Sequence, residues 1–184
     1  MSITISIVGG PHSGKSTLAS QINSILKTKG LNSVFCEEYA VEYIAKYGVP
    51  TCVEHQMIIF YEQMKKEKMF HGSRDFIVCD SSSWLSYIYS KSYLQQPISK
   101  QSLKSLNFLQ HEILENINYW NYVFYVPVME NYMLDGVRYT TKNEAIELDK
   151  MIKGFLNLER VPYIDLSSID LEHRIDKVIE TILK

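Results

Sequence analysis

Residues 9–16 read GGPHSGKS and decide the fold of this 184-residue chain. Their spacing is G-x-x-x-x-G-K-S, the phosphate-binding P-loop, and they stand between an apolar run at 3–8 and a helical pattern that starts near Lys15. Small residues let such a loop curl so that backbone N–H groups point at phosphate oxygens, and the helix behind it adds its positive dipole end. A plain glycine turn between a strand and a helix is the alternative, and the complete motif in this context argues against it.

The motif also assigns chemistry to individual side chains. Lys15 is expected to reach the β- and γ-phosphates, and the hydroxyl of Ser16 is expected to bind Mg²⁺. The pattern therefore predicts ATP and Mg²⁺ as cofactors. The residues expected to bind the nucleotide are Gly9, Gly10, Pro11, His12, Ser13, Gly14, Lys15, Ser16 and Thr17.

The composition is that of an ordinary globular domain. Hydrophobic residues make up 46% of the chain and charged residues 22%, with a formal net charge of −2, so the total charge does not favour nucleic acid. Cys36 and Cys79 lie in apolar runs and are expected to be core thiols, which suggests a reducing compartment. The sequence shows no signal-peptide pattern and no apolar run of about 18 residues, so we expect a cytoplasmic protein without a membrane span.

Apolar strand-like runs alternate with helical patterns along the chain. Strands are expected at 3–8, 33–36, 76–79, 122–126 and 163–166, and helices at about 15–28, 54–70, 83–93, 101–118, 144–158 and 170–183, with a further helix that ends at Tyr47. This alternation predicts right-handed crossovers and an α/β fold with a five-stranded parallel sheet and helices on both faces. We expect one domain over residues 1–184.

Acidic residues follow two of the expected strands, at the edge of the sheet where parallel strands bind ligands. Asp80 comes directly after the strand at 76–79 and is expected to support the metal ion. Glu38 follows the second strand and is expected to hold the acceptor or to take the proton from its hydroxyl. The alternatives are a helix N-cap for Asp80 and a solvated helix start for Glu37 and Glu38.

A polar loop at 135–141 begins with Asp-Gly-Val-Arg and precedes a helix. Phosphoryl transfer needs positive charge on the γ-phosphate, and a lid can deliver that charge while excluding water. We therefore expect a lid segment at about 131–145, in which Arg138 contacts the transferred phosphate and Lys142 can add to the charge. A turn with a surface arginine is the alternative.

Taken together, the motifs resemble one family. The chain is similar over nearly its whole length to the P-loop kinases grouped with the ribosylnicotinamide kinase domain of bacterial NAD regulators, an AAA-type ATPase/kinase family, with nucleoside and thymidylate kinases as more distant relatives. The resemblance implies the three-layer P-loop NTPase/kinase fold and an ATP-dependent phosphotransferase whose catalytic residues are Lys15, Glu38, Asp80 and Arg138. The stretches that carry it are 9–17, Glu38-Tyr39-Ala40, Asp80 with Ser86 and Tyr89, and 135–138 with Asp149 and Ile152.

Three positions depart from the pattern of that family. Val41 stands where the family has an arginine after Glu-Tyr-Ala, and Ser81 stands where nucleoside kinases have the arginine of Asp-Arg-Ser. Ala145 lies near the place of a second lid arginine. The missing cations suggest a substrate with less phosphate to hold, different lid chemistry, or a kinase of reduced activity.

The function expected from the sequence is transfer of the γ-phosphate of ATP to a hydroxyl of a nucleoside- or nucleotide-like acceptor. We expect this small molecule to be the partner of the protein and expect no association with a membrane. A homodimer is a further option. One alternative is a kinase that acts on a modified base or an end of DNA, favoured if a groove is rimmed by Lys65, Lys66, Lys68, Lys91 and Lys100. The other is a nucleotide-dependent switch without an acceptor, although residues 127–130 read PVME where a GTPase would carry Asn-Lys-x-Asp.

Overall fold

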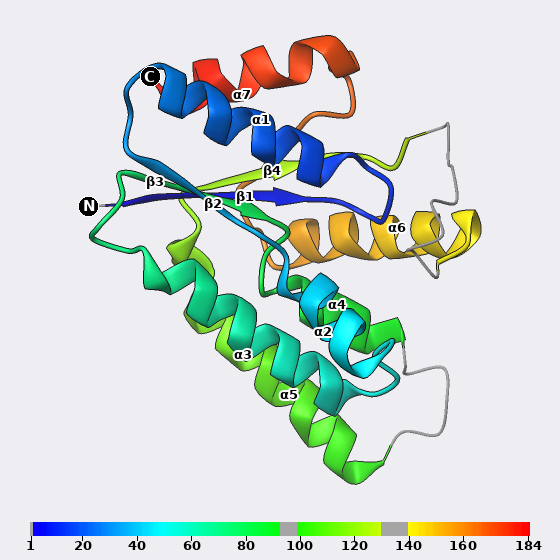
Figure 1. Ribbon diagram of the computed structural model, residues 1–184. Helices are drawn as coiled ribbons and strands as arrows, with labels where there is room; N and C mark the ends of the chain where they lie inside the picture. Colours follow the sequence, from blue (N-terminus) through cyan, green and yellow to red (C-terminus); the bar gives the residue numbers. More distant parts are fainter. Residues whose placement is uncertain (1, 93–98, 130–139) are drawn as a thin grey trace.

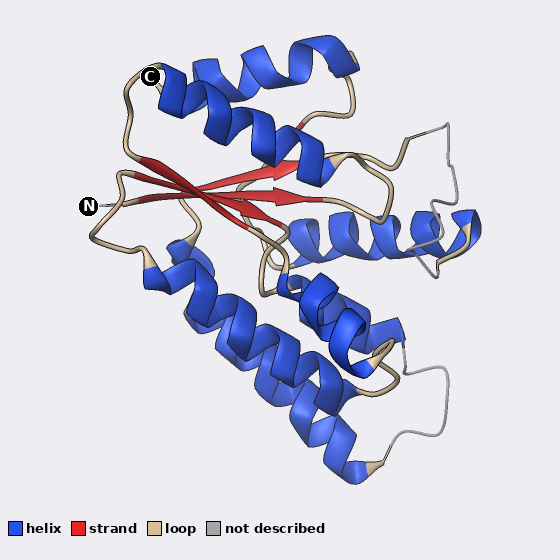
Figure 2. Cartoon of the chain, viewed as in Figure 1, coloured by secondary structure: helices blue, strands red, loops and turns tan. Residues whose placement is uncertain are grey.

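The computed structural model describes residues 2–92, 99–129 and 140–184, and its centre is a five-stranded sheet (Figure 1). All neighbouring strands are parallel, in the order β2-β3-β1-β4-β5. The three-layer α/β fold predicted from the sequence is confirmed, because helices cover both faces of this sheet (Figure 2). The strands are β1 (Ile3–Val8), β2 (Ser33–Cys36), β3 (Phe76–Asp80), β4 (Tyr122–Tyr125) and β5 (Ile164–Asp165).

The described α-helices lie close to the predicted ranges. They are α1 (Lys15–Thr28), α2 (Tyr39–Tyr47), α3 (Val53–Met69), α4 (Leu85–Ser92), α5 (Lys100–Glu115), α6 (Lys142–Leu158) and α7 (Arg174–Ile182). Two short 3-10 helices, η2 (Ile117–Tyr119) and η3 (Leu171–His173), follow α5 and precede α7. None of the described helices combines the length and the apolarity needed to cross a bilayer.

Helices α1 and α7 cover one face of the sheet (Figure 1). Leu18, Ile22 and Leu26 recur every four residues along α1, so they share one side of the helix and are buried against β1. Val178 and Ile182 of α7 extend the same cluster. Burial of these side chains fixes α1, and with it the loop that leads into α1.

Helices α3, α4, α5 and α6 cover the opposite face, with α2 beyond them (Figure 1). Their core is aromatic at its centre, where Trp84 stacks on Phe155 with 5.3 Å between ring centres. Tyr87 also packs on Phe155, so two of the aromatic side chains after β3 belong to the core. This cluster holds α4 and α6 together below the carboxyl ends of the strands.

The strand register places the carboxyl ends of three strands side by side. Ile7 of β1 lies opposite Asp80 of β3, and Cys36 of β2 lies opposite Cys79 of β3. Both thiols are buried, as predicted, and the hydrogen bond to Cys36 together with burial raises the pKa of Cys79. The segments that follow β1, β2 and β3 therefore start from the same edge of the sheet.

Element boundaries differ from the predictions where side chains redirect the chain. Helix α6 begins at Lys142 because Thr141 and Glu144 form a capping box, in which each side chain bonds the other residue's backbone N–H. Strand β5 has two residues, and the Asp165 carboxylate then accepts the N–H of Ser167, which turns the chain. The last helix starts with the 3-10 turn η3 and becomes α-helical at Arg174.

Candidate active site

The P-loop leaves β1 at Gly9 and enters α1 at Lys15. A Cβ atom on Gly9 would lie 2.0 Å from the carbonyl oxygen of Val126, so the loop passes too close to the end of β4 for any side chain. Gly14 has a φ of 84°, a left-handed conformation that glycine adopts at little cost, and it caps α1. The first turn of α1 is fully described and carries no acidic side chain, so this helix end can attract an anion.

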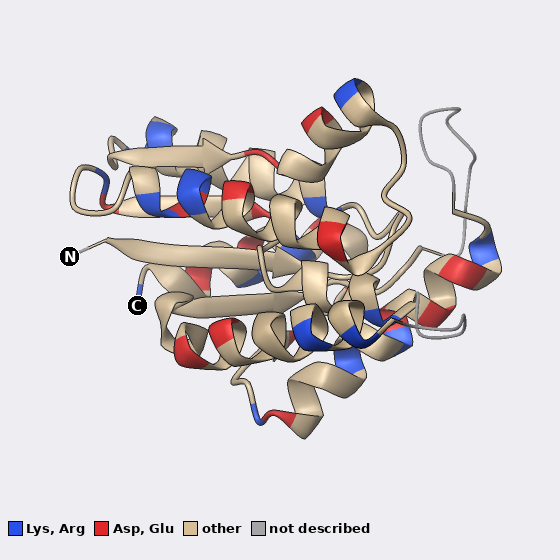
Figure 3. Cartoon of the chain, turned by 90° about the horizontal axis from the view of Figure 1, so that it is seen from below, with Lys and Arg blue, Asp and Glu red and all other residues tan. Residues whose placement is uncertain are grey.

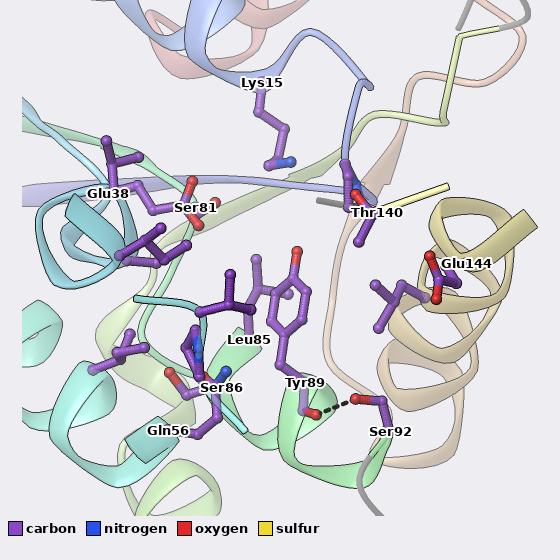
Figure 4. A pocket seen from close by; sticks show the side chains of 18 of the residues that line it. Lys15, Glu38, Gln56, Ser81, Leu85, Ser86, Tyr89, Ser92, Thr140 and Glu144 are labelled. Atoms are coloured by element: carbon purple, nitrogen blue, oxygen red, sulfur yellow. Dashed lines mark hydrogen bonds between the residues drawn. The ribbon is translucent and has the colours of Figure 1, made fainter. Parts of the chain in front are cut away.

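Lys15 lies across the inside of the loop. Its side chain is mostly buried, and its ammonium group donates to the carbonyl oxygen of Gly10 at 2.9 Å and to Oγ of Ser13 at 3.5 Å. Figure 4 shows the side chain extending from the loop into the cavity below it. The loop's own oxygens thus hold the ammonium group at the place where the motif expects phosphates, with Ser16 and Thr17 exposed beside it.

A cleft of about 1320 Å³ opens beneath the P-loop. Lys15 and Ser16, Glu38 at the end of β2, and Ser81 directly after β3 all line it. In Figure 4, Glu38 and Ser81 lie on one side of the cleft, and Thr140 and Glu144 lie on the other. The structure therefore brings together the segments that the strand-end argument selected.

Glu38 and Glu37 differ in position. Glu38 occupies the N-cap position of α2, but its side chain makes no capping hydrogen bond and faces the cleft. Glu37 is exposed and is not among the residues that line the cleft. The predicted alternative of a solvated helix start therefore describes Glu37, whereas Glu38 lines the cleft.

Asp80 is buried at the end of β3, beside the strand that leads into the P-loop. Its carboxylate and the Ser16 hydroxyl are hard oxygen donors of the kind that Mg²⁺ prefers. Residues 2–92, 99–129 and 140–184 contain no group of three or more His, Cys, Asp or Glu side chains that could bind a metal. The pair of Asp80 and Ser16 suits Mg²⁺, which is often held by one or two protein groups together with substrate phosphates.

The turn after Asp80 is held by contacts on several sides. Ser81 has a φ of 64°, which is unusual for a residue with a side chain, and its N–H donates to the carbonyl oxygen of Ile7 at 3.2 Å. The hydroxyl groups of Ser82 and Ser6 are hydrogen bonded. These contacts fix the direction in which the chain leaves β3, and therefore the place of Ser81 at the cleft.

Glu67 of α3 supports the same turn from inside the protein. It is fully buried, and its carboxylate accepts the N–H of Ser83 at 2.8 Å and the indole N–H of Trp120 at 3.0 Å. Burial raises the pKa of Glu67 to about 7, although these hydrogen bonds act in the opposite direction. The sequence interpretation missed this residue; the signal was its spacing after Phe60 and Met64, which puts an acid on the buried side of α3.

The raised pKa of Glu67 predicts how stability depends on pH. Between its usual pKa of 4.5 and about 7, the folded protein binds a proton at Glu67 that the unfolded chain releases, so the free energy of unfolding falls as pH rises. Relative to Glu67→Gln, the wild type should lose about 2 to 3 kcal/mol between about pH 5 and about pH 8. Urea unfolding of both proteins at the two pH values measures this difference. Glu62→Gln, at a half-exposed position of the same helix, is the control and should keep the wild-type slope, whereas parallel curves for Glu67→Gln and wild type would contradict a raised pKa.

The predicted lid is only partly within the described residues. Arg138 and residues 131–139 lie outside them, and the part from 142 onward is the first turn of α6. Of the three positions where the resemblance predicted arginine, Val41 and Ser81 line the cleft, and Ala145 is buried against the P-loop. At positions 41 and 81, the cleft therefore lacks two cations that the resemblance predicted.

A second pocket, of about 550 Å³, lies on the other side of the P-loop. Gly14 and Thr17 line both pockets. The apolar side chains of the second pocket come from α1, from the segment after β4, from η3 and from α7; these are Leu18, Val126, Met129, Leu171 and Ile175. Polar and charged side chains, which are Ser13, Gln21, Asp170, Glu172 and Arg174, complete its lining. The P-loop thus separates a large cleft, which carries both polar and apolar side chains, from a smaller pocket with a mostly apolar surface.

The sequence matches a known family over most of its length. The profile of a family described as an AAA domain matches residues 4–174. The chain belongs to this AAA domain family. No curated protein matches the sequence of this chain significantly.

Solved structures share the fold of this AAA domain. Deoxyadenosine kinase from M. mycoides with bound dATP superposes with a TM-score of 0.69 at 17% identity, over 99% of this chain and 100% of that one. NadR protein in complex with NR gives a TM-score of 0.71 at 18% identity, over 97% of this chain and 51% of that one. The resemblance to P-loop kinases predicted from the sequence is thus confirmed for family and fold.

Proposed function

We propose that this AAA domain is a kinase that transfers the γ-phosphate of ATP to a hydroxyl group of a nucleoside-like acceptor. The observation that carries the proposal is the shared cleft, because one cavity is lined by the phosphate-binding lysine, by a strand-end glutamate and by the turn after Asp80. Its volume of about 1320 Å³ exceeds the usual size of a site for one small ligand, roughly 300–1,000 Å³. There is room for the phosphates of a donor and for an acceptor beside them.

The two pockets suggest how donor and acceptor divide the space. A P-loop binds the phosphates in the middle, and the apolar pocket behind Gly14 and Thr17 suits the flat base of the donor. The acceptor then occupies the cleft in front, where Gln56, Ser86 and Tyr89 supply polar groups and an aromatic ring (Figure 4). The fold shared with deoxyadenosine kinase and NadR supports a nucleoside-like acceptor.

The charges in the cleft favour an acceptor without a phosphate of its own. Among the described lining residues, Lys15 and Lys91 are cationic, whereas Glu38, Glu144 and Glu147 are acidic. Lys15 belongs to the donor phosphates, and the ammonium group of Lys91 lies 4.9 Å from the ring centre of Tyr87. Since recognition of a second phosphate requires further cations, a nucleoside fits this cleft better than a nucleotide.

The proposed reaction is an in-line transfer in which the residues of the chain have separate roles. Glu38 accepts the proton of the acceptor hydroxyl as its oxygen forms a bond to the γ-phosphorus, and the bond to the β-phosphate oxygen breaks to release ADP. Lys15 and the P-loop N–H groups stabilise the charge on the β- and γ-phosphates. Arg138, which follows β4 in the sequence, is proposed to add positive charge at the transferred group.

Ser16 and Asp80 are the residues that would hold Mg²⁺. When bound, the ion would supply positive charge that offsets the negative charge of the phosphates. Asp80 ends the strand next to β1, the strand that leads into the P-loop, so its carboxylate would help to hold the ion from the sheet. The burial of Asp80 leaves acceptor chemistry to Glu38.

The basic groove that would favour a DNA acceptor is not formed by the five predicted lysines. Of these five, Lys91 lines the cleft, whereas Lys66 pairs with Glu42 and Lys65 pairs with Glu62 at 3.7 Å. Figure 3 shows Lys and Arg interspersed with Asp and Glu along the described helices. A DNA acceptor is therefore the weaker proposal, and the homodimer stays a prediction.

A transfer assay with labelled ATP tests the proposed function. The purified protein is incubated with ATP labelled in the γ-phosphate, Mg²⁺ and one acceptor at a time, with ribo- and deoxynucleosides, their monophosphates and a 5′-hydroxyl oligonucleotide as the panel. We expect label on at least one nucleoside and none on the monophosphates or the oligonucleotide. Labelled oligonucleotide would support the DNA alternative, and hydrolysis of ATP without transfer to any acceptor would support the switch.

A further inference from the structure

The carboxylate of Asp149 connects α6 to the P-loop. Its Oδ1 accepts the N–H of Gly10 at 2.8 Å, and its Oδ2 accepts the hydroxyl of Tyr125 at 2.6 Å. Both oxygens of one side chain are thus bonded to groups on two other elements. Asp149 is not among the residues that line either pocket, so it acts on the loop from behind.

Gly10 is held on both sides of its backbone. Its N–H donates to Asp149, and its carbonyl oxygen accepts the ammonium group of Lys15 at 2.9 Å. When phosphates enter the loop, Lys15 is expected to turn from this carbonyl toward them. The bond to Asp149 then remains as a side-chain contact that fixes the Gly9–Gly10 peptide, in which neither residue has a side chain of its own to restrict the backbone.

The backbone of Gly10 is packed closely against α6. A Cβ atom on Gly10 would lie 2.9 Å from the carbonyl oxygen of Ala145 and 3.0 Å from Cβ of Asp149. The first turns of α6 therefore touch the backbone of the loop directly. A shift of the Asp149 side chain would be transmitted to Gly10 without an intervening group.

Tyr125 fixes the orientation of Asp149. The tyrosine is buried in β4. The ammonium group of Lys153 lies 5.0 Å from the centre of its ring and forms an ion pair with Asp165 of β5 at 2.7 Å. Burial and the hydrogen bond to Asp149 raise the pKa of Tyr125, so its hydroxyl stays a donor at neutral pH. Tyr125 thus donates to one oxygen of Asp149 while the other oxygen accepts from Gly10.

We propose that Asp149, oriented by Tyr125, is a positioning residue that sets the conformation of the P-loop for nucleotide binding. This inference rests on the proposed function only in that the P-loop binds a nucleotide. Without the carboxylate, the Gly9–Gly10 peptide can rotate and turn a carbonyl oxygen toward the phosphates. The cost should appear in the affinity for the nucleotide and not in the affinity for the acceptor, which lies in the cleft.

Calorimetric titration of the purified variants with ATP in the absence of acceptor tests the inference. Asp149→Ala should weaken ATP binding roughly 10- to 100-fold, the usual effect of losing a hydrogen bond to a charged group. Asp149→Asn should recover most of the affinity, because an amide oxygen still accepts from Gly10 and the amide nitrogen can donate to the oxygen of Tyr125. Tyr125→Phe should weaken binding less than Asp149→Ala does, and the double variant should bind no more weakly than Asp149→Ala alone.

Controls separate this inference from the proposed function. Lys150→Ala removes an exposed charge from the next position of α6 and should bind ATP as the wild type does. Titrations are run below the melting temperature of every variant, and the acceptor KM, measured at saturating ATP, should stay near its wild-type value. Wild-type ATP affinity in Asp149→Ala and Tyr125→Phe would overturn the inference and leave the kinase proposal standing. Wild-type protein that binds ATP but phosphorylates no acceptor would overturn the proposed function, and the titrations would still decide the role of Asp149.

Discussion

Glu38→Gln should lower kcat for phosphate transfer by about 10²- to 10⁴-fold, the range that a general base contributes. The amide keeps the size of the side chain and can still hydrogen bond an acceptor hydroxyl, but it cannot take up the proton. Because Glu38 lies at the end of β2, across the cleft from α6, ATP affinity should change little (Figure 4). Steady-state kinetics with the nucleoside identified in the transfer assay, combined with titration by ATP, measure both quantities.

Glu37→Gln is the matched control for this experiment. It removes a neighbouring negative charge from an exposed side chain that does not line the cleft, so transfer should stay close to the wild-type rate. Weakened ATP binding with normal transfer in Glu38→Gln would assign Glu38 to the donor side. Equal losses in Glu37→Gln and Glu38→Gln would show a general effect of charge instead of a role for one carboxylate.

Lys15→Ala should reduce turnover by about 10²- to 10³-fold, because one oriented cation at the developing charge is worth a few kcal/mol. The ammonium group is mostly buried and bonded to Gly10 inside the loop, so bulk water cannot replace it. Affinity for ATP should fall as well, since the contact with the phosphates already exists before transfer. Rates at saturating ATP, together with ATP titrations, separate the two effects.

Lys27→Ala provides the control for the loss of positive charge. Lys27 is exposed in the last turn of the same helix, far along α1 from the P-loop. Its removal should leave both turnover and ATP affinity near the wild-type values. Turnover near normal in Lys15→Ala would remove Lys15 and the P-loop from the proposed mechanism.

The fold was predictable because its signals are local. The P-loop spacing predicts a strand, a turn and a helix within about twenty residues. Apolar runs predict the other strands, and apolar residues about 3.6 positions apart predict the other helices. The parallel arrangement then follows from alternation, and the strand-end rule placed Glu38 and the segment after Asp80 at one cleft. These inferences need only the order of elements along the chain.

The supports of the site were not predictable in the same way, because they join distant segments. The hydrogen bond between Gly10 and Asp149 connects residues that are 139 positions apart, and the one between Glu67 and Trp120 spans 53 positions. No period or motif in one segment names the partner in another. Glu67, which is fully buried, is visible in the sequence only as a charged residue at a position that should be apolar.

The two pockets on either side of the P-loop have a consequence for inhibitor chemistry. Because Gly14 and Thr17 border both cavities, a single molecule can carry an aromatic head into the apolar pocket and a sugar-like head into the cleft, joined by a chain of phosphates or phosphonates along the loop. Linking the heads makes the second contact intramolecular, which raises the overall affinity above that of either head alone when the linker matches the span. The optimum linker length would itself measure the separation of the two sites in solution.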